Sequence, residues 1–271
     1  MHQQEIPTKA ERHLRRDLAR ALRGFRMIDP GDRILVAMSG GKDSYALFHL
    51  LQDLARRAPV PFSLVAVHVH QGQPGHDPAP LVAWLQARGA ELHVEHDATY
   101  PIVMRTTPPG KSPCSMCCRL RRAILYRVAK QLGCTKVALG HHREDTLVTL
   151  LLNLTFSGQL KAMPPKLLAE DGENVVIRPL LYCAEAEIRQ LAVTHQFPVL
   201  PKGLCGPAPD LQRQAMGQLL DALEARHAGA KAQMLAAVAN VRPTHLLDVG
   251  LWERLGLPLA AEAGEGEGGE E

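Results

Sequence analysis

One short segment of the chain has the residue types and spacing of a phosphate-binding loop. Residues 39–44 read Ser-Gly-Gly-Lys-Asp-Ser and follow a short apolar run. Backbone N–H groups of Gly40 and Gly41 can approach an anion closely, and the dipole of a helix beginning there favours negative charge. Lys42 would add charge, and the hydroxyls of Ser39 and Ser44 would donate hydrogen bonds. The segment predicts a phosphate site, and the alternative is a tight turn without a ligand.

The aspartate of this loop is its unusual member. Asp43 is suited either to hold a magnesium ion or to orient the turn, because a carboxylate oxygen is a preferred ligand of Mg²⁺. The order of residues also differs from that of the Walker loop, in which the lysine and the hydroxyl follow a longer spacer.

A second candidate element lies at residues 140–146, which read Gly-His-His-Arg-Glu-Asp-Thr after another apolar run. Ligands of open parallel sheets gather at the carboxyl ends of the strands, so Gly140, His141 and Asp145 are candidate nucleotide contacts. The alternative is an ordinary helix start, whose first-turn acids are favoured by the helix dipole.

The cysteines indicate a metal or cluster site. Cys114 and Cys117 form a CxxC, and Cys205 is a third candidate ligand far along the chain. Zinc would need a fourth ligand, and no second CxxC completes a four-cysteine set. An iron–sulfur cluster can leave one iron without a protein thiolate. The other three cysteines are interpreted as buried or incidental thiols: Cys118, Cys134 and Cys183. Cys118 also competes with its neighbour Cys117 as a ligand.

Composition limits the class of protein. The chain has 271 residues, of which 46% are hydrophobic, so it can bury one large core or a core with a smaller appended unit. No run approaches the roughly 20 apolar residues that span a bilayer, and residues 1–16 are not signal-like. We therefore expect a cytoplasmic protein without membrane association and with reduced thiols. The net charge of +3 is too small to indicate a nucleic-acid partner.

The elements that must position these residues alternate between strand and helix. This order predicts an α/β fold, a parallel sheet with helices on both faces, followed by a helical C-terminal region. The expected strands are 33–38, 63–68, 91–96, 136–139 and 175–178. The expected helices are 45–55, 81–88, 119–131, 143–154 and 184–194, with 211–239 mainly helical.

Four parts are expected along the chain. Residues 1–29 carry a basic amphipathic helix, 30–200 form the nucleotide-binding domain with the CxxC, 201–261 form the helical region with Cys205, and 262–271 are a disordered acidic tail. One face of the first helix carries arginines that suit either solvent or phosphate: Arg12, Arg16, Arg20 and Arg23.

The loop at 39–44 resembles the Ser-Gly-Gly-x-Asp-Ser motif of the PP-loop, or N-type ATP pyrophosphatase, family. That family cleaves ATP between the α and β phosphates, leaves AMP on a substrate oxygen, and expels it with a nitrogen or sulfur nucleophile. Taken together, several segments make the chain resemble the TtcA-type branch, the tRNA 2-thiocytidine synthetases. They are 37–45, 64–67, 73–75, 113–122, 138–143, 162–167, 177–180, 204–206, 211–213 and 243–248.

This resemblance implies a specific activity. It implies that Cys114, Cys117 and Cys205 hold a [4Fe-4S] cluster, and that Lys42 and Asp43 act in catalysis with ATP and Mg²⁺. The substrate would be cytidine 32 of certain tRNAs, whose C2 oxygen is adenylated and then replaced by sulfur from a cysteine desulfurase. The enzyme would be a homodimer. Arginines after the CxxC are candidate phosphate contacts, or else ordinary helix-surface charges: Arg119, Arg121 and Arg122.

The chain departs from the family pattern at three places. His68 and His70 stand where the family has asparagine and aspartate, Glu144 replaces an aspartate, and residues 207–210 differ from the usual Ser-Gln-x-Asn. Two other readings stay open: a different PP-loop tRNA-modifying enzyme, of the 2-thiouridine or lysidine type, and a non-enzymatic RNA-binding protein with structural zinc.

Overall fold

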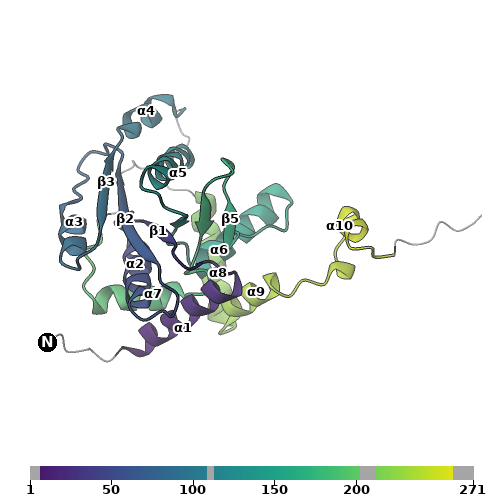
Figure 1. The fold of residues 1–271 in the computed structure, drawn as a ribbon. Helices are drawn as coiled ribbons and strands as arrows, with labels where there is room; N and C mark the ends of the chain where they lie inside the picture. Colours follow the sequence, from purple (N-terminus) through teal and green to yellow (C-terminus); the bar gives the residue numbers. More distant parts are fainter. Residues whose placement is uncertain (1–6, 109–112, 202–210, 259–271) are drawn as a thin grey trace, which may run out of the picture.

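A six-stranded sheet forms the centre of the structure, a computed structural model that describes residues 7–108, 113–201 and 211–258 (Figure 1). The strand order is β3-β2-β1-β4-β6-β5. Five strands are parallel: β1 (Arg33–Ala37), β2 (Ser63–His70), β3 (Leu92–His96), β4 (Lys136–Ala138) and β6 (Val175–Ile177). The expected parallel sheet is confirmed. The edge strand β5 (Lys166–Leu168) is antiparallel and was not expected, because three largely exposed residues show no hydrophobic pattern.

Helices cover both faces of the sheet, as predicted. One face packs against α1 (Lys9–Gly24), α2 (Lys42–Ala55), α3 (Ala79–Gln86) and α7 (Glu185–Thr194), and the other against α5 (Cys114–Gln131). Successive residues of β1 enter opposite layers, since Ile34 and Val36 lie in the first core and Leu35 in the second. This burial on both faces explains why the strands read as continuous apolar runs.

The N-terminal helix begins at a residue that caps it. The hydroxyl of Thr8 accepts a hydrogen bond from the Glu11 N–H at 3.2 Å. Leu14 and Leu18 are buried against the sheet's first core, so α1 packs as part of the α/β body. The predicted arginine face is exposed, and the Arg20 guanidinium lies over the Tyr182 ring at 4.2 Å.

The C-terminal part is helical, as expected. Helices α8 (Leu211–Arg226) and α9 (Ala230–Val238) pack on α6 (Arg143–Leu152) through Leu147, Leu220 and Leu235. Beyond α9, the 3-10 turn η2 (Pro243–His245) and α10 (Val249–Arg254) extend away from the sheet (Figure 1). Helix α6 ends in a single π-helical turn, η1 (Asn153–Ser157), and a short helix α4 (Thr99–Thr106) precedes α5. None of the helices in the described ranges is long and apolar enough to span a bilayer.

Candidate functional site

The two predicted phosphate-contacting segments meet where the strand order reverses. Strand β1 pairs with β2 on one side and with β4 on the other, with Val36 beside Ala138 in the parallel register. The loop after β1 leads into α2, and the loop after β4 leads into α6. Two helix N-termini therefore open on one edge, where α/β proteins bind anionic ligands.

The first loop is held by its own hydrogen bonds. Gly40 has a φ of +79°, and a Cβ there would lie 2.4 Å from the Leu200 side chain, so only glycine fits without a shift. The Ser39 hydroxyl accepts from the Gly41 N–H at 3.3 Å, and the Ser44 hydroxyl donates to the Gly41 carbonyl at 2.8 Å. The loop is thus shaped before a ligand arrives.

The backbone of the second loop packs directly against the backbone of the first loop. A Cβ on Gly140 would lie 3.1 Å from the Asp43 carbonyl oxygen and 3.2 Å from the Ser44 nitrogen. Backbone atoms cannot move aside as a flexible side chain can. Glycine at 140 is therefore a requirement for joining the two loops.

Replacing Gly140 by alanine is expected to weaken ATP binding. Such overpacking typically costs about 1–3 kcal/mol, and forcing the loops apart would weaken binding by about tenfold or more. Isothermal titration with a non-hydrolysable ATP analogue measures the effect. Gly217→Ala is the matched control, because a Cβ at this position of α8 meets nothing within 4 Å. Equal affinities for the two variants would refute the contact.

Lys42 and Asp43 form an ion pair at the start of α2. The Lys42 Nζ lies 2.9 Å from Asp43 Oδ1 and 2.9 Å from Glu185 Oε1, at the start of α7. Burial opposes the charged form of Lys42, but the two carboxylates raise its pKa above the usual value. Glu185 also pairs with Arg189 at 2.9 Å. Glu185 belongs to no local motif, since only the packing of α7 brings it to the loop.

His142 joins the second loop to the first. Its Nε2 lies 3.7 Å from Asp43 Oδ1 and 3.4 Å from Asp145 Oδ2, and its Nδ1 lies 3.2 Å from Glu144 Oε2. Burial disfavours the imidazolium, but these three carboxylates raise the pKa of His142 above its ordinary value. The neighbouring His141 was the predicted nucleotide contact, and burial lowers its pKa to about 4.

Asp145 connects the edge to the C-terminal helices. Its Oδ1 lies 2.8 Å from the Nη2 of Arg213 on α8, and its Oδ2 accepts from the His142 N–H at 3.1 Å. Burial opposes its ionisation, but the nearby histidines lower the pKa of Asp145. In the sequence, Arg213 stands out only as part of segment 211–213, which resembles the family. Its ion pair with Asp145 depends on tertiary packing.

The CxxC lies on the first turn of α5. This helix begins at Cys114, five residues earlier than predicted, so Cys114 and Cys117 are one turn apart on the same side. Cys117 is buried and Cys114 half-buried, whereas Cys118 is exposed. This donor pair suits an iron–sulfur cluster or another thiophilic metal, provided that further ligands are supplied.

Cys205, the predicted third ligand, lies outside the described residues, so its role stays a prediction. Among the other cysteines, Cys183 is fully buried, as interpreted, and burial raises its pKa well above the usual value. Cys134 is half-buried, and burial also raises its pKa.

A hydrogen-bond chain connects α5 to the edge that carries the nucleotide loop. The Gln71 side chain, directly after β2, donates to the Cys117 carbonyl at 3.5 Å and accepts from the Arg121 Nε at 2.7 Å. Arg121 and Ser39 line the same cavity of about 50 Å³. The first turn of α5, which carries the CxxC, therefore lies at the same edge of the sheet as the phosphate loop.

The predicted phosphate-contacting arginines divide into two groups. Arg121 points to Gln71 and lies at the edge just described. Arg119 and Arg122 are exposed and line an open groove of about 780 Å³ on the outer side of α5, together with basic and acidic side chains. Of these three arginines, Arg119 and Arg122 are therefore the ones accessible to an extended polyanion.

His68, one of the departures from the family pattern, supports the nucleotide loop. It is buried, and its Nδ1–H donates to the Met38 carbonyl at 2.7 Å, directly before Ser39. Its Nε2 must then accept from His76 Nε2, at 2.9 Å. Burial lowers the pKa of His68 to about 4, so the ring is neutral at pH 7. The sequence shows that His68 departs from the family pattern, but it does not show that His68 holds the backbone before the phosphate loop.

The fold and the two loops define a PP-loop ATP-binding protein, and the sequence model of the PP-loop domain matches residues 10–199. The tRNA-cytidine(32) 2-sulfurtransferase of Sorangium cellulosum (strain So ce56) is 56% identical over 253 residues, which cover 93% of this chain and 89% of that protein. That of Erwinia tasmaniensis is 48% identical over 245 residues, 90% of this chain and 79% of that protein. The chain belongs to the tRNA-cytidine(32) 2-sulfurtransferase family.

A solved structure has the same fold. The U34-tRNA thiolase NcsA from Methanococcus maripaludis, solved with its [4Fe-4S] cluster, superposes with a TM-score of 0.69 at 24% identity. The match covers 85% of this chain and 79% of that one.

Proposed function

We propose that this protein is an ATP-dependent tRNA sulfurtransferase that replaces the C2 oxygen of cytidine 32 by sulfur. The observation that carries the proposal is the meeting of the phosphate loop, the Gly140 loop and the CxxC at one edge of the sheet. An edge of this kind can hold an activated oxygen next to a source of sulfur. Sequence identity to tRNA-cytidine(32) 2-sulfurtransferases supports the choice of base and position.

The first half of the reaction makes the oxygen a leaving group. The C2 oxygen of the base attacks the α-phosphorus of ATP, a new O–P bond forms, and pyrophosphate leaves. The backbone N–H groups of the phosphate loop and the charge of Lys42 would hold the phosphates in position. Asp43 is the residue proposed to hold Mg²⁺, which offsets the charge of the departing pyrophosphate.

The second half exchanges oxygen for sulfur. Sulfide adds to C2, the C2–O bond breaks, and AMP leaves, so no net oxidation or reduction occurs once the sulfur is at the sulfide level. Cys114, Cys117 and Cys205 are the residues that would hold a [4Fe-4S] cluster. When bound, the cluster would supply an iron without a protein thiolate, on which sulfide can be presented. A cysteine desulfurase is the proposed origin of this sulfur. It delivers the sulfur as a persulfide, so a dithiol or a low-potential electron carrier must supply two electrons that reduce it to sulfide before the addition.

The tRNA must present its base in an exposed form. A loop nucleotide can be splayed out of its stack to enter a buried site, while the flanking backbone is held by cations. Arg119 and Arg122 are proposed to contact phosphates of the tRNA. We further propose that the enzyme acts in the cytoplasm as a homodimer.

Loss of either arginine is expected to weaken tRNA binding without affecting ATP. Arg119→Ala and Arg122→Ala should each reduce the slope of log affinity against log salt by about 1, as expected for one lost phosphate contact. Filter binding at several salt concentrations measures this slope. Arg57→Ala is the control, because Arg57, just beyond the end of α2, is paired with Asp53 and does not line this groove. An unchanged slope in both variants would remove the groove from the tRNA site.

Mass analysis of the modified nucleosides in cellular tRNA tests the proposed function. A strain that lacks the gene should contain no 2-thiocytidine, and the wild-type gene should restore it. Unchanged 2-thiocytidine with loss of 2-thiouridine or lysidine would assign the protein to another branch of PP-loop enzymes. Loss of no modified nucleoside would favour a non-catalytic role in RNA binding.

A further inference from the structure

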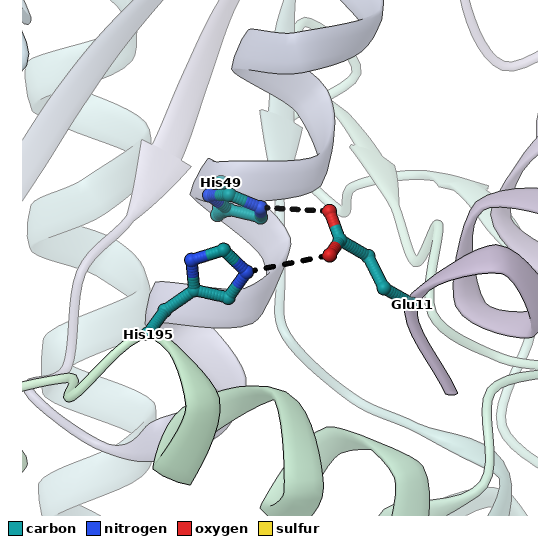
Figure 2. Close-up of side chains that lie close together, drawn as sticks. All are labelled: Glu11, His49 and His195. Carbon is teal, nitrogen blue, oxygen red and sulfur yellow. Dashed lines mark hydrogen bonds and ion pairs between the residues drawn. The ribbon is translucent and has the colours of Figure 1, made fainter. Parts of the chain in front are cut away.

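Three metal-ligating side chains meet on the helical layer away from the phosphate loop. Glu11 comes from α1, His49 from α2 and His195 from the residue directly after α7 (Figure 2). Each histidine directs its Nε2 at a different oxygen of the Glu11 carboxylate, and both distances are 3.4 Å. The Glu11 side chain is 6% exposed, and the two imidazoles are 17% and 18% exposed. His49 lies about two helical turns beyond Lys42, so this trio is distinct from the nucleotide site.

We propose that the trio of Glu11, His49 and His195 binds a divalent transition-metal ion of the Zn²⁺ class. The separation of 3.4 Å is long for a hydrogen bond between nitrogen and oxygen. Each separation is close to the separation of about 3.3 Å between two ligand atoms of a zinc ion, whose bonds to nitrogen and oxygen are about 2.0–2.1 Å. Because the two nitrogens face different oxygens, Glu11 would bind the ion through both oxygens of its carboxylate. Two imidazoles and one carboxylate are also ligands that zinc prefers.

The surroundings leave room for a fourth ligand. His49 lines an open cavity of about 420 Å³ together with Arg15, Gln52 and Asp53. Water from this cavity can complete a site with three protein ligands, as in many zinc sites. Each of the three side chains offers one ligand atom, and these three atoms lie within 4.8 Å of one another.

Arg15 is the charged group that competes with a metal. Its Nη2 lies 2.5 Å from Glu11 Oε1 and 3.0 Å from Asp53 Oδ2. A carboxylate has about four lone-pair positions, so Glu11 can retain Arg15 and still ligate through its remaining lone pairs. Asp53 offsets part of the arginine charge. Arg15→Gln is therefore expected to tighten metal binding, because it removes a positive charge next to the ion.

The proposed ion would join three separate segments of the chain. Residues 11 and 49 lie on α1 and α2, residue 195 directly follows α7, and these three helices pack together on one face of the sheet. Binding to the folded state alone stabilises that state in proportion to the logarithm of the metal concentration. We therefore expect Zn²⁺ to raise the melting temperature of the holoenzyme.

The experiment uses anaerobic holoenzyme with its full iron content, so that the cysteine ligands are already occupied. After equilibrium dialysis against Zn²⁺, metal analysis should give one zinc per chain in the wild type. His49→Gln and His195→Gln should each weaken zinc binding by more than about tenfold, since even loss of a group that only orients a ligand costs about 10–100-fold. Iron per chain should not change in either variant.

His13→Gln is the matched control. His13 pairs with Glu187 at 2.7 Å between α1 and α7, and in the part of the chain that the structure describes it is not part of a group of three ligating side chains. This variant should keep its zinc and its zinc-dependent rise in melting temperature. Absence of zinc from the wild type, or equal zinc in wild type, His49→Gln and His195→Gln, would overturn the proposal. If one variant loses iron through misfolding, the other, on a different segment, decides.

Discussion

Replacing Cys117 by alanine is expected to lower iron from about four per chain to less than one and to reduce 2-thiocytidine formation to background. Cys117 is buried on the first turn of α5, on the same side as Cys114. Two remaining thiolates cannot hold a cluster that needs three. Anaerobic iron analysis and nucleoside mass spectrometry measure the two losses. The same result is expected for Cys114→Ala and Cys205→Ala.

Three other cysteines provide the control for this prediction. Cys118→Ala, Cys134→Ala and Cys183→Ala should keep both iron and activity. Cys118 is the sharpest comparison, because it follows Cys117 directly and has the same chemistry but is exposed. A cluster that survives Cys205→Ala and is lost in Cys118→Ala would contradict the proposed ligand set.

Replacing Asp43 by asparagine is expected to reduce turnover by about 10²–10³-fold while iron stays at the wild-type level. The substitution keeps the shape of the side chain and removes the charge that holds Lys42 and faces His142. The proposed magnesium ligand is lost at the same time. Single-turnover release of pyrophosphate, measured beside iron content, separates a nucleotide defect from a cluster defect.

Asp17→Asn is the control for this second prediction. Asp17 is also ion-paired on a helix, with Arg16 at 2.9 Å, but lies on α1 away from both loops. It should retain wild-type turnover. Near-normal turnover in Asp43→Asn would exclude Asp43 from the catalytic site, and loss of iron with activity would indicate a folding defect.

The sequence predicted the sheet because β1, β2 and β4 are buried on both faces and therefore read as apolar runs. It did not predict β5, which has three residues and little buried surface. It placed the start of α5 too late, since the cysteines of the first turn carry no helical hydrophobic pattern of their own. Boundaries of this kind are set by tertiary contacts.

The candidate site was predicted where its residues are adjacent in sequence. Residues 39–44 and the CxxC are local motifs, and their spacing predicts a phosphate site and a metal or cluster site. The [4Fe-4S] cluster and the adenylation chemistry were implied by the family resemblance. Glu185 and Arg213 are not local, because they reach Lys42 and Asp145 only through the packing of α7 and α8. The trio of Glu11, His49 and His195 was missed for the same reason.

The most direct test of the proposed function follows the oxygen atom that is replaced. Purified holoenzyme is given ATP, sulfide and a tRNA whose cytidine 32 carries ¹⁸O at C2. Adenylation of that oxygen predicts one AMP per 2-thiocytidine formed, with the ¹⁸O label in the AMP. Formation of 2-thiocytidine with unlabelled AMP would contradict the account, as would release of labelled AMP without sulfur in the base.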